Sequence, residues 1–245
     1  YAYAETCAAL ASLFWCREMS VLTGRPRYDD LFEWQLYNAA SVGIGMDGRS
    51  YFYNNPLACR GNLSRAGWYL VPCCPPNLSR TWASLGEYLY HEDKDELHLQ
   101  QYITSAIQLD WGTVNVESGL PWTGEIRLAF DLPQPHQTTL HLRIPSWTNN
   151  YSLLLSDSVL HPDHVTEATS TPETACGYTP YAARTLSITR TWSSGDVLSL
   201  TFDMPLRFHR QHKKVPGCGG MDALSRGPLV YCLESVDNPL DLFSV

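Results

Sequence analysis

The chain has 245 residues, of which 44% are hydrophobic and 12% aromatic, and its formal net charge at pH 7 is −8. This length allows one large or two ordinary domains with a sizeable core. The acidic balance excludes a basic nucleic-acid surface, and no apolar run approaches the roughly 18 residues of a membrane span, so neither a nucleic-acid nor a membrane partner is expected.

Two helices are predicted at the beginning of the chain. Apolar residues recur near helical spacing over residues 5–22, with no glycine or proline before Gly24. After the break at Gly24 and Pro26, a second helical pattern covers residues 28–40. The first residues, from Tyr1 onward, look like the inside of a helix without a cap, which indicates an excerpt of a longer protein.

Two adjacent cysteines, Cys73 and Cys74, are enclosed by prolines in residues 71–77. The prolines predict a turn that lets both thiols act together, because neighbouring side chains on a regular element diverge. Since proline biases the preceding residue towards extended backbone, we expect Cys74 and Pro75 to lie outside a helix and Asn77 to cap one that runs to about Tyr88. A short strand is expected at residues 51–53.

Two thiolates on a stiff turn suit zinc, which takes four ligands in sulfur-rich sites. The alternative is that both cysteines are small apolar core residues, and the spacing alone does not decide, because the pair lacks the CxxC spacing of a strong zinc motif. The eight cysteines are scattered rather than arranged as a dense disulfide framework, which favours a reducing, cytoplasmic location.

Beyond residue 91 the pattern changes from helical to alternating, so we place a boundary between a helical domain, 1–91, and a strand-rich part, 92–245. Antiparallel β-sandwich structure is expected there, with an irregular connection over residues 156–181. Strands are predicted at 97–103, 124–132, 138–144, 151–155, 185–192, 197–202 and 228–233. No pair among the eight histidines is expected to bind a metal.

Several segments together resemble glycoside hydrolase family 127, whose members include β-L-arabinofuranosidases. The resemblance covers most of the chain from Tyr3 to about Leu233, and residues 156–220 contribute little to it. It rests on Glu5-Thr6-Cys7, Glu33 with Tyr37-Asn38, Phe52-Tyr53 with Asn55-Pro56-Leu57, Cys73-Cys74-Pro75-Pro76-Asn77, and Arg226-Gly227-Pro228-Leu229-Val230-Tyr231.

The resemblance implies a multi-domain α and β protein, in which the last helices of an (α/α)6 barrel precede antiparallel β-sandwich structure. It also implies a zinc ion bound by Cys7, Cys73, Cys74 and a glutamate, which is expected upstream and therefore outside this chain. A glycoside or oligosaccharide is the implied partner, and a homodimer is compatible with it.

The resemblance further implies a retaining hydrolase for terminal β-L-arabinofuranose or a related sugar. Cys73 would be the nucleophile, Glu5 the general acid/base, and Glu33 and Tyr53 would contact the sugar. The chain alone should be inactive, since further sugar-contacting residues are expected upstream.

Each of these residues also has a simpler reading. Glu33 could be a solvated helix residue, Tyr53 a packed ring and Glu5 a surface charge. A second hypothesis for the whole chain is therefore a structural zinc site joined to a carbohydrate-binding or assembly β-sandwich module.

Overall fold

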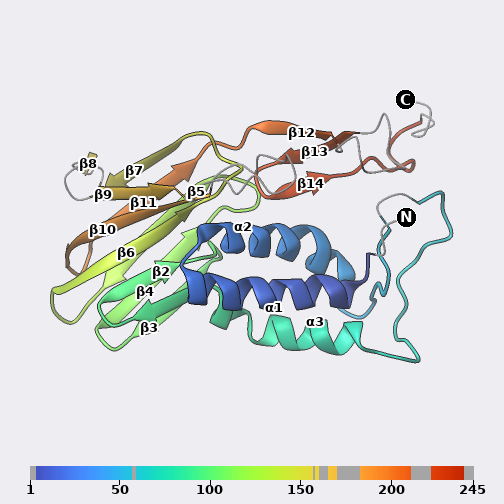
Figure 1. The fold of residues 1–245 in the computed structure, drawn as a ribbon, viewed down its shortest axis with the longest axis horizontal. Coiled ribbons are helices and arrows are strands. Elements are labelled where there is room, and N and C mark those ends of the chain that lie inside the picture. Colours follow the sequence, from blue (N-terminus) through green and yellow to red (C-terminus); the bar gives the residue numbers. More distant parts are fainter. Residues whose placement is uncertain are drawn as a thin grey trace.

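The computed structural model describes residues 4–56, 59–156, 158–159, 165–169, 183–210 and 222–239. Figure 1 shows a group of helices at one end of a β-sandwich, with a small sheet on the same side as the helices. Helices are few and strands predominate, so the chain combines α and β structure as expected.

The helical part begins with α1 (Thr6–Thr23) and α2 (Pro26–Gln35), which form a hairpin. α1 ends at Gly24, whose φ of 62° is easily adopted by glycine, and the Gly24 N–H donates to the Ser20 carbonyl at 2.8 Å. Pro26 then opens α2 in its first turn, where the missing N–H breaks no helical bond. In the described part of the chain, no helix has the length and apolar character needed to cross a membrane.

The predicted helix at 28–40 does not stay regular. α2 ends at Gln35, and the chain continues as a π-helical turn, η1 (Leu36–Ala40), and a 3-10 turn, η2 (Ser41–Gly43). Two side chains donate hydrogen bonds to backbone carbonyls here. The Asn38 amide donates to the Trp34 carbonyl at 2.8 Å, and the Ser41 hydroxyl donates to the Leu36 carbonyl. The expected strand at 51–53 is reduced to isolated bridges from Tyr51 to Ile44 and Ala66.

The third helix begins earlier than predicted. α3 (Cys74–Ala83) starts at Cys74, with Cys73 in the cap position, and a 3-10 turn, η3 (Leu85–Tyr88), follows it. Pro75 and Pro76 therefore lie in the first turn, where their missing N–H groups have no helical partner to lose. The prediction that Cys74 and Pro75 lie outside the helix was wrong because prolines at this position initiate a helix.

Two sheets form the sandwich, in the strand orders β1-β2-β6-β10-β9 and β3-β4-β5-β11-β7-β8. Buried residues from both, such as Leu140 and Leu186 in the first and Val114 and Leu198 in the second, share one core. The strands are β1 (Tyr90–Asp93), β2 (Glu96–Leu99), β3 (Ser105–Leu109), β4 (Gly112–Ser118), β5 (Glu125–Asp131), β6 (His136–Ile144), β7 (Tyr151–Leu155), β8 (Ser158–Val159), β9 (Val165–Thr169), β10 (Arg184–Trp192) and β11 (Val197–Phe202).

The sandwich departs from the predicted pattern in two ways. β2 and β6 run parallel, because the chain leaves the first sheet after β2, builds β3 to β5 in the facing sheet and returns as β6. β8 and β9 lie within residues 156–181, which were predicted to be irregular; the rest of that segment, apart from Ser156, is outside the described residues.

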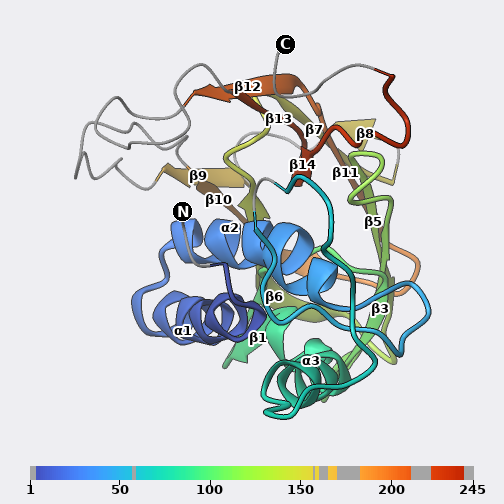
Figure 2. The same cartoon turned by 90° about the vertical axis from the view of Figure 1, so that its right-hand side faces the viewer.

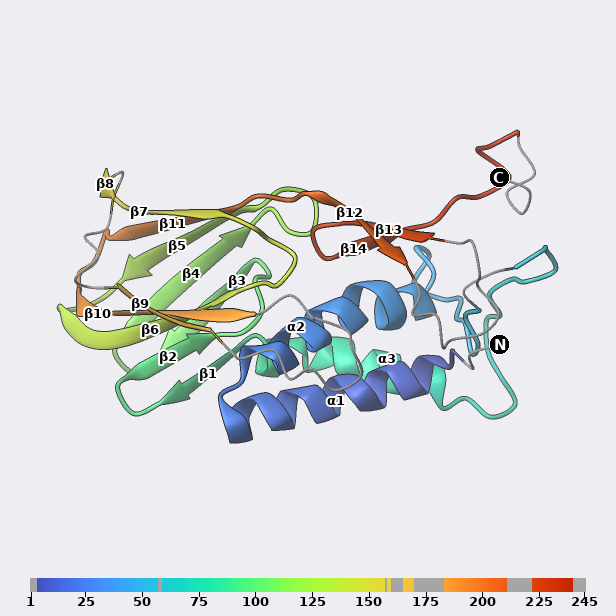
Figure 3. The same ribbon diagram turned by 45° about the horizontal axis from the view of Figure 1, so that its top comes forward.

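A third, antiparallel sheet consists of β12 (Leu206–Arg210), β13 (Asp222–Arg226) and β14 (Leu229–Tyr231). Figures 2 and 3 show this sheet beside α2 and the turns that follow it. Asn38 of η1 joins the two: its amide donates to the Pro228 carbonyl at 2.8 Å, and its carbonyl accepts from the Val230 N–H at 2.7 Å. Two segments that carried the family resemblance, around Asn38 and around Pro228, therefore form one contact.

A buried arginine joins α2 to the sandwich. Arg143, at the end of β6, is 2% exposed and donates to Asp30 at 2.7 Å and to Glu33 at 2.6 Å. Trp147 Nε1 donates to the second oxygen of Glu33 at 2.7 Å, and Arg143 Nε donates to the Gln100 carbonyl at 2.7 Å. All three charges are thus paired and hydrogen-bonded, which is the condition for tolerating them in a protein interior.

Asp29, which precedes Asp30 in the chain, is expected to make the stability of the fold depend on pH. Burial raises the pKa of Asp29 to about 7, although the Ser20 hydrogen bond and Arg143 act in the opposite direction. Because the folded pKa exceeds the unfolded value of about 3.9, the native state holds the extra proton, and its stability should fall as the pH rises from about 4 to 7. Asp29→Asn should remove this slope and be more stable than wild type at pH 8, by up to roughly 4 kcal/mol.

Urea unfolding at pH 4.5 and pH 8 would measure this difference. Asp110→Asn, at an exposed turn, is the control and should keep the wild-type slope. An unchanged slope in Asp29→Asn would show that Asp29 is ionised in the native protein throughout this range.

Candidate active site

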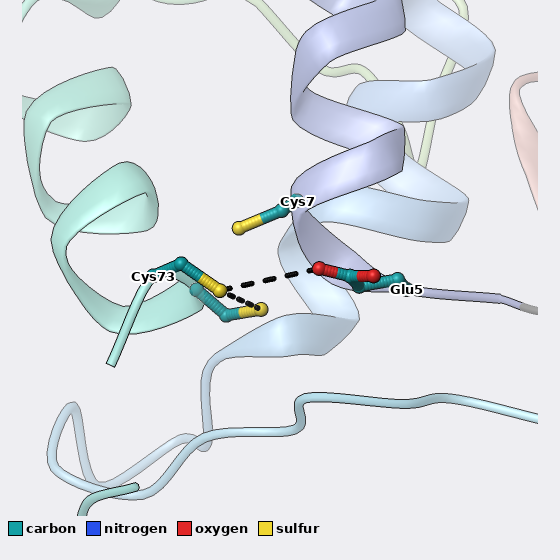
Figure 4. A group of neighbouring side chains, drawn as sticks. Glu5, Cys7 and Cys73 are labelled. Atoms are coloured by element: carbon teal, nitrogen blue, oxygen red, sulfur yellow. Dashed lines mark hydrogen bonds between the residues drawn. The ribbon is translucent and has the colours of Figure 1, made fainter. Parts of the chain in front are cut away.

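Two separate segments bring the predicted thiols and Glu5 together. Glu5 immediately precedes α1 and Cys7 lies in its first turn, while Cys73 and Cys74 begin α3. Figure 4 shows Cys7, Cys73 and Glu5 pointing towards a common centre between the two helices. The proline-enclosed pair and the start of α1 therefore form a single site.

The segment that precedes α1 is fixed by backbone pairing with residues 52–55. The Thr6 N–H donates to the Tyr53 carbonyl at 3.0 Å, and the Asn55 N–H donates to the Ala4 carbonyl at 2.8 Å. The Thr6 hydroxyl donates to the Phe52 carbonyl at 2.8 Å. Glu5, with φ −84° and ψ 135°, is extended rather than helical, so its side chain can turn towards Cys7 although the two are only two residues apart.

The ligand atoms have the spacing of a metal site. One carboxylate oxygen of Glu5 and the sulfurs of Cys7, Cys73 and Cys74 all lie within 4.8 Å of one another. The Cys73 and Cys74 sulfurs are 3.8 Å apart, and the Cys73 sulfur is 4.0 Å from Glu5 Oε1. In tetrahedral zinc coordination, bonds of about 2.3 Å to sulfur and about 2.1 Å to oxygen place ligands about 3.6–3.8 Å apart. The four residues therefore fit a zinc ion.

This arrangement changes one expectation. The fourth metal ligand was expected upstream of the chain, but Glu5 supplies a fourth donor in the same group as the three thiols. The Glu5-Thr6-Cys7 segment offered a signal for this, because a glutamate two residues before a cysteine can reach the same centre when it precedes the helix instead of lying in it. Three thiolates and one carboxylate are a suitable donor set for zinc.

The three thiols differ in acidity. Burial tends to raise the pKa of Cys73, but hydrogen bonds from Cys7, Tyr53 and Cys74 outweigh burial and lower it overall. Burial raises the pKa of Cys7 and, more strongly, that of Cys74. Cys73 is therefore the thiol that ionises first, and thiolate is the nucleophilic form of cysteine.

Tyr53 lies next to the thiols, since its hydroxyl hydrogen-bonds to Cys73 and its carbonyl lies 4.0 Å from the Cys74 sulfur. Two further residues lie here for which the sequence analysis predicted no role in the site. Tyr69 accepts a hydrogen bond from the Tyr53 N–H at 3.0 Å, and the Asn77 amide donates to the Cys7 sulfur at 3.2 Å. The spacing offered a signal for Asn77, because residues three and four apart share a helix face, and Asn77 follows Cys73 by four.

Glu33 does not join this group in the structure. The residue is 2% exposed, and its two carboxylate oxygens accept hydrogen bonds from Arg143 and Trp147 of the sandwich. No exposed oxygen is left for a sugar hydroxyl, so this position does not support the predicted sugar contact. The sequence could not show this, because both partners lie more than a hundred residues away.

Comparison with known proteins places these features in one class of enzymes, the glycoside hydrolases. Three family models match in succession: the GH127 catalytic domain of β-L-arabinofuranosidase at residues 1–87, the GH127 middle domain at 96–204 and the family 127 C-terminal domain at 206–245. The chain belongs to glycoside hydrolase family 127.

Curated and solved relatives agree with this family. A non-reducing end β-L-arabinofuranosidase from Bifidobacterium longum subsp. longum is 32% identical over 99% of the chain. A GH127 β-L-arabinofuranosidase from Geobacillus stearothermophilus T6 is 34% identical over 98% of the chain, with a TM-score of 0.79. A GH127 β-arabinofuranosidase is 32% identical over 99% of the chain, with a TM-score of 0.83. The chain spans 37–39% of the length of these proteins.

Proposed function

We propose that this chain forms part of a retaining glycoside hydrolase that releases terminal β-L-arabinofuranose, or a related sugar, and that Cys73 is its nucleophile. The convergence of Glu5, Cys7, Cys73 and Cys74 from separate segments supports this function. Membership of a family that contains β-L-arabinofuranosidases supports the choice of substrate.

We assign α1, α2 and α3 to the end of an (α/α)6 barrel and residues 92–245 to the β-sandwich part that follows it. The match of residues 1–87 to the catalytic-domain model supports this assignment. The site then lies at the barrel end of the chain, while the contacts of Arg143 and Asn38 attach the sheets to the helices.

Zinc would be held by Glu5, Cys7, Cys73 and Cys74, and its positive charge would keep the thiols deprotonated at neutral pH. The Cys73 sulfur would attack the anomeric carbon as the bond from that carbon to the leaving oxygen breaks, and an acid would protonate the leaving oxygen. Water would then displace sulfur from the sugar, with the same group acting as base. Two displacements retain the configuration of the anomeric carbon.

Glu5 has two candidate roles, metal ligand and general acid/base. A ligand carboxylate must be deprotonated, and one bound to zinc is poorly suited to carry a proton. Because its oxygen lies within the same 4.8 Å group as the three sulfurs, we favour the ligand role. The acid/base would then come from the portion of the catalytic domain that the relatives have and this chain does not include.

Tyr53 would position both the nucleophile and the sugar. Its hydroxyl contacts Cys73, and its ring packs edge-on against Tyr69 with centroids 5.7 Å apart. This packing supports the proposal, because it holds the ring beside the thiol that would attack, and the hydroxyl would contact a sugar bound there.

A structural zinc site with a carbohydrate-binding sandwich is the competing function, and the four protein ligands favour it, because closed coordination is typical of structural zinc. Chemical modification separates the two. If Cys73 is the nucleophile, iodoacetamide should alkylate it faster than Cys7 or Cys74 in the full-length enzyme, and arabinose should slow the reaction. Equal slow labelling of all three thiols, unaffected by sugar, would support the structural site.

The metal site is tested by the zinc content of variants after gel filtration in metal-free buffer. Wild type should retain about one equivalent of zinc. Glu5→Gln and the double variant Cys7→Ala/Cys74→Ala should each retain less than about a fifth of that amount, because each loses donors from a four-ligand site. Cys232→Ser, an exposed cysteine outside the group, is the control and should retain the wild-type amount.

Glu5→Gln distinguishes the two roles of this residue. Full zinc content together with lost hydrolysis would make Glu5 the acid/base and leave the fourth ligand outside the chain. Unchanged zinc content in the cysteine double variant would contradict the site itself.

A further inference from the structure

A second group of metal-ligating side chains lies on the sandwich, outside the thiol site. His98 of β2 and His141 of β6 are directly opposite each other in the parallel pair, and Glu96 precedes His98 by two residues on β2. Residues two apart on a strand share a face, so all three side chains lie on one face of the sheet, opposite the core-facing Leu97 and Leu140. The pairing of β2 with β6, which the sequence did not predict, creates this group.

The distances suit coordination of a single ion. Glu96 Oε2 lies 3.5 Å from His98 Nε2 and 3.4 Å from His141 Nε2, and the three ligand atoms are all within 4.8 Å of one another. Bonds of about 2.0–2.1 Å in a tetrahedral site place neighbouring ligands about 3.4 Å apart. The two imidazole rings are stacked with centroids 4.2 Å apart, and both Nε2 atoms lie beside the same carboxylate oxygen. Because an imidazole lone pair lies in the plane of its ring, the rings would turn from this stacked arrangement to bind one ion.

The environment favours neutral imidazoles with free nitrogen lone pairs. Burial lowers the pKa of His98 and of His141, although the charge of Glu96 partly offsets it. His141 Nδ1 is 2.8 Å from the Ser187 hydroxyl on β10; donation of its proton there leaves the Nε2 lone pair directed at the group. Among the described residues, buried His141 Nε2 has no well-aligned hydrogen-bond partner. A bound cation would satisfy this atom.

We propose that Glu96, His98 and His141 form a second metal site, which binds a divalent transition metal such as Zn²⁺ through two imidazole nitrogens and one carboxylate oxygen. Imidazole ligands select zinc, nickel or copper over magnesium or calcium. Three protein ligands leave a position for water, so binding should be weaker than at the thiol site.

The ion would connect β2 to β6, the one parallel strand pair in the described sheets. β1 and β2 form the hairpin through which the chain passes from η3 into the sandwich, and β2 contacts the rest of its sheet through β6. Metal binding at this position would therefore stabilise the attachment of this hairpin, because an ion that binds only the folded state adds to its stability.

Calorimetric titration with Zn²⁺ tests the second site. The protein is first loaded with one equivalent of Zn²⁺, so that the thiol site is already occupied. Wild type should show a further binding event, and His98→Ala, His141→Ala and Glu96→Gln should each weaken it at least tenfold. His91→Ala is the matched control: its ring is 6.0 Å from His98, on the neighbouring strand, but it is not part of the ligand group, so binding should not change.

The second site would be overturned if the wild type shows no further Zn²⁺-binding event. It would also be overturned if His98→Ala and His141→Ala bind this further Zn²⁺ as strongly as the wild type. If those variants do not fold, the wild type alone decides. Zn²⁺ should then protect His98 and His141, but not His91, from modification by diethyl pyrocarbonate, and equal labelling with and without Zn²⁺ would overturn the site.

Discussion

Cys73→Ser is expected to reduce hydrolysis of an aryl β-L-arabinofuranoside by more than about 10³-fold in kcat when introduced into the full-length enzyme. A serine hydroxyl ionises far less readily than a thiol, so the variant lacks the anion that would attack the anomeric carbon. Removing Cys73 also removes a metal donor, so zinc content must be measured alongside activity. Steady-state kinetics with a chromogenic substrate would give the ratio.

Cys232→Ser should keep wild-type activity, because this exposed thiol lies outside the ligand group. Intact-mass analysis of wild type after brief mixing with substrate should find one added sugar on the peptide that contains Cys73. Full activity in Cys73→Ser, or a sugar attached to Glu5, would make the carboxylate the nucleophile and leave the thiols only to hold the metal.

Arg143→Ala is expected to destabilise the chain by about 3–5 kcal/mol, the largest stability effect we predict. The substitution leaves Asp30 and Glu33 without their shared cation, and Glu33 is 2% exposed, so its charge would remain buried and unpaired. Urea unfolding at pH 7 would measure the loss. Arg127→Ala is the control, because Arg127 and Glu117 form an exposed pair that should contribute less than about 1 kcal/mol.

Removing the charges of both the arginine and the two carboxylates should restore part of the stability that Arg143→Ala loses. Arg143→Met combined with Asp30→Asn and Glu33→Gln replaces the ion pairs by neutral groups and should be more stable than Arg143→Ala. A loss below about 1 kcal/mol in Arg143→Ala would show that water reaches the two carboxylates.

The thiol site could be predicted through the family resemblance, whose motifs are short and local, whereas the cysteine spacing alone left a core role open. Adjacent cysteines between prolines and a Glu-x-Cys segment are visible in a few residues each, and the structure brings both to one centre. The role of Pro75 and Pro76 was misjudged because proline prevents a helix from continuing but favours its first turn, and the residues alone did not show which case applied.

The contacts that depend on long-range pairing could not be predicted. Glu33 looked like a sugar-binding or solvated residue, and its partner Arg143 lies 110 residues further along the chain. The histidines looked unrelated, because His98 and His141 meet only through the parallel pairing of β2 with β6. Periodicity identifies strands but does not say which strands are neighbours.

Zinc K-edge X-ray absorption on the His98→Ala chain, loaded with one equivalent of zinc, tests the proposed metal centre most directly. The substitution removes the second site, so the spectrum should report on the thiol site alone. Ligation by Glu5, Cys7, Cys73 and Cys74 predicts about three sulfur neighbours near 2.3 Å and one oxygen near 2.0–2.2 Å. A first shell with no sulfur, or with nitrogen and oxygen in the majority, would contradict it.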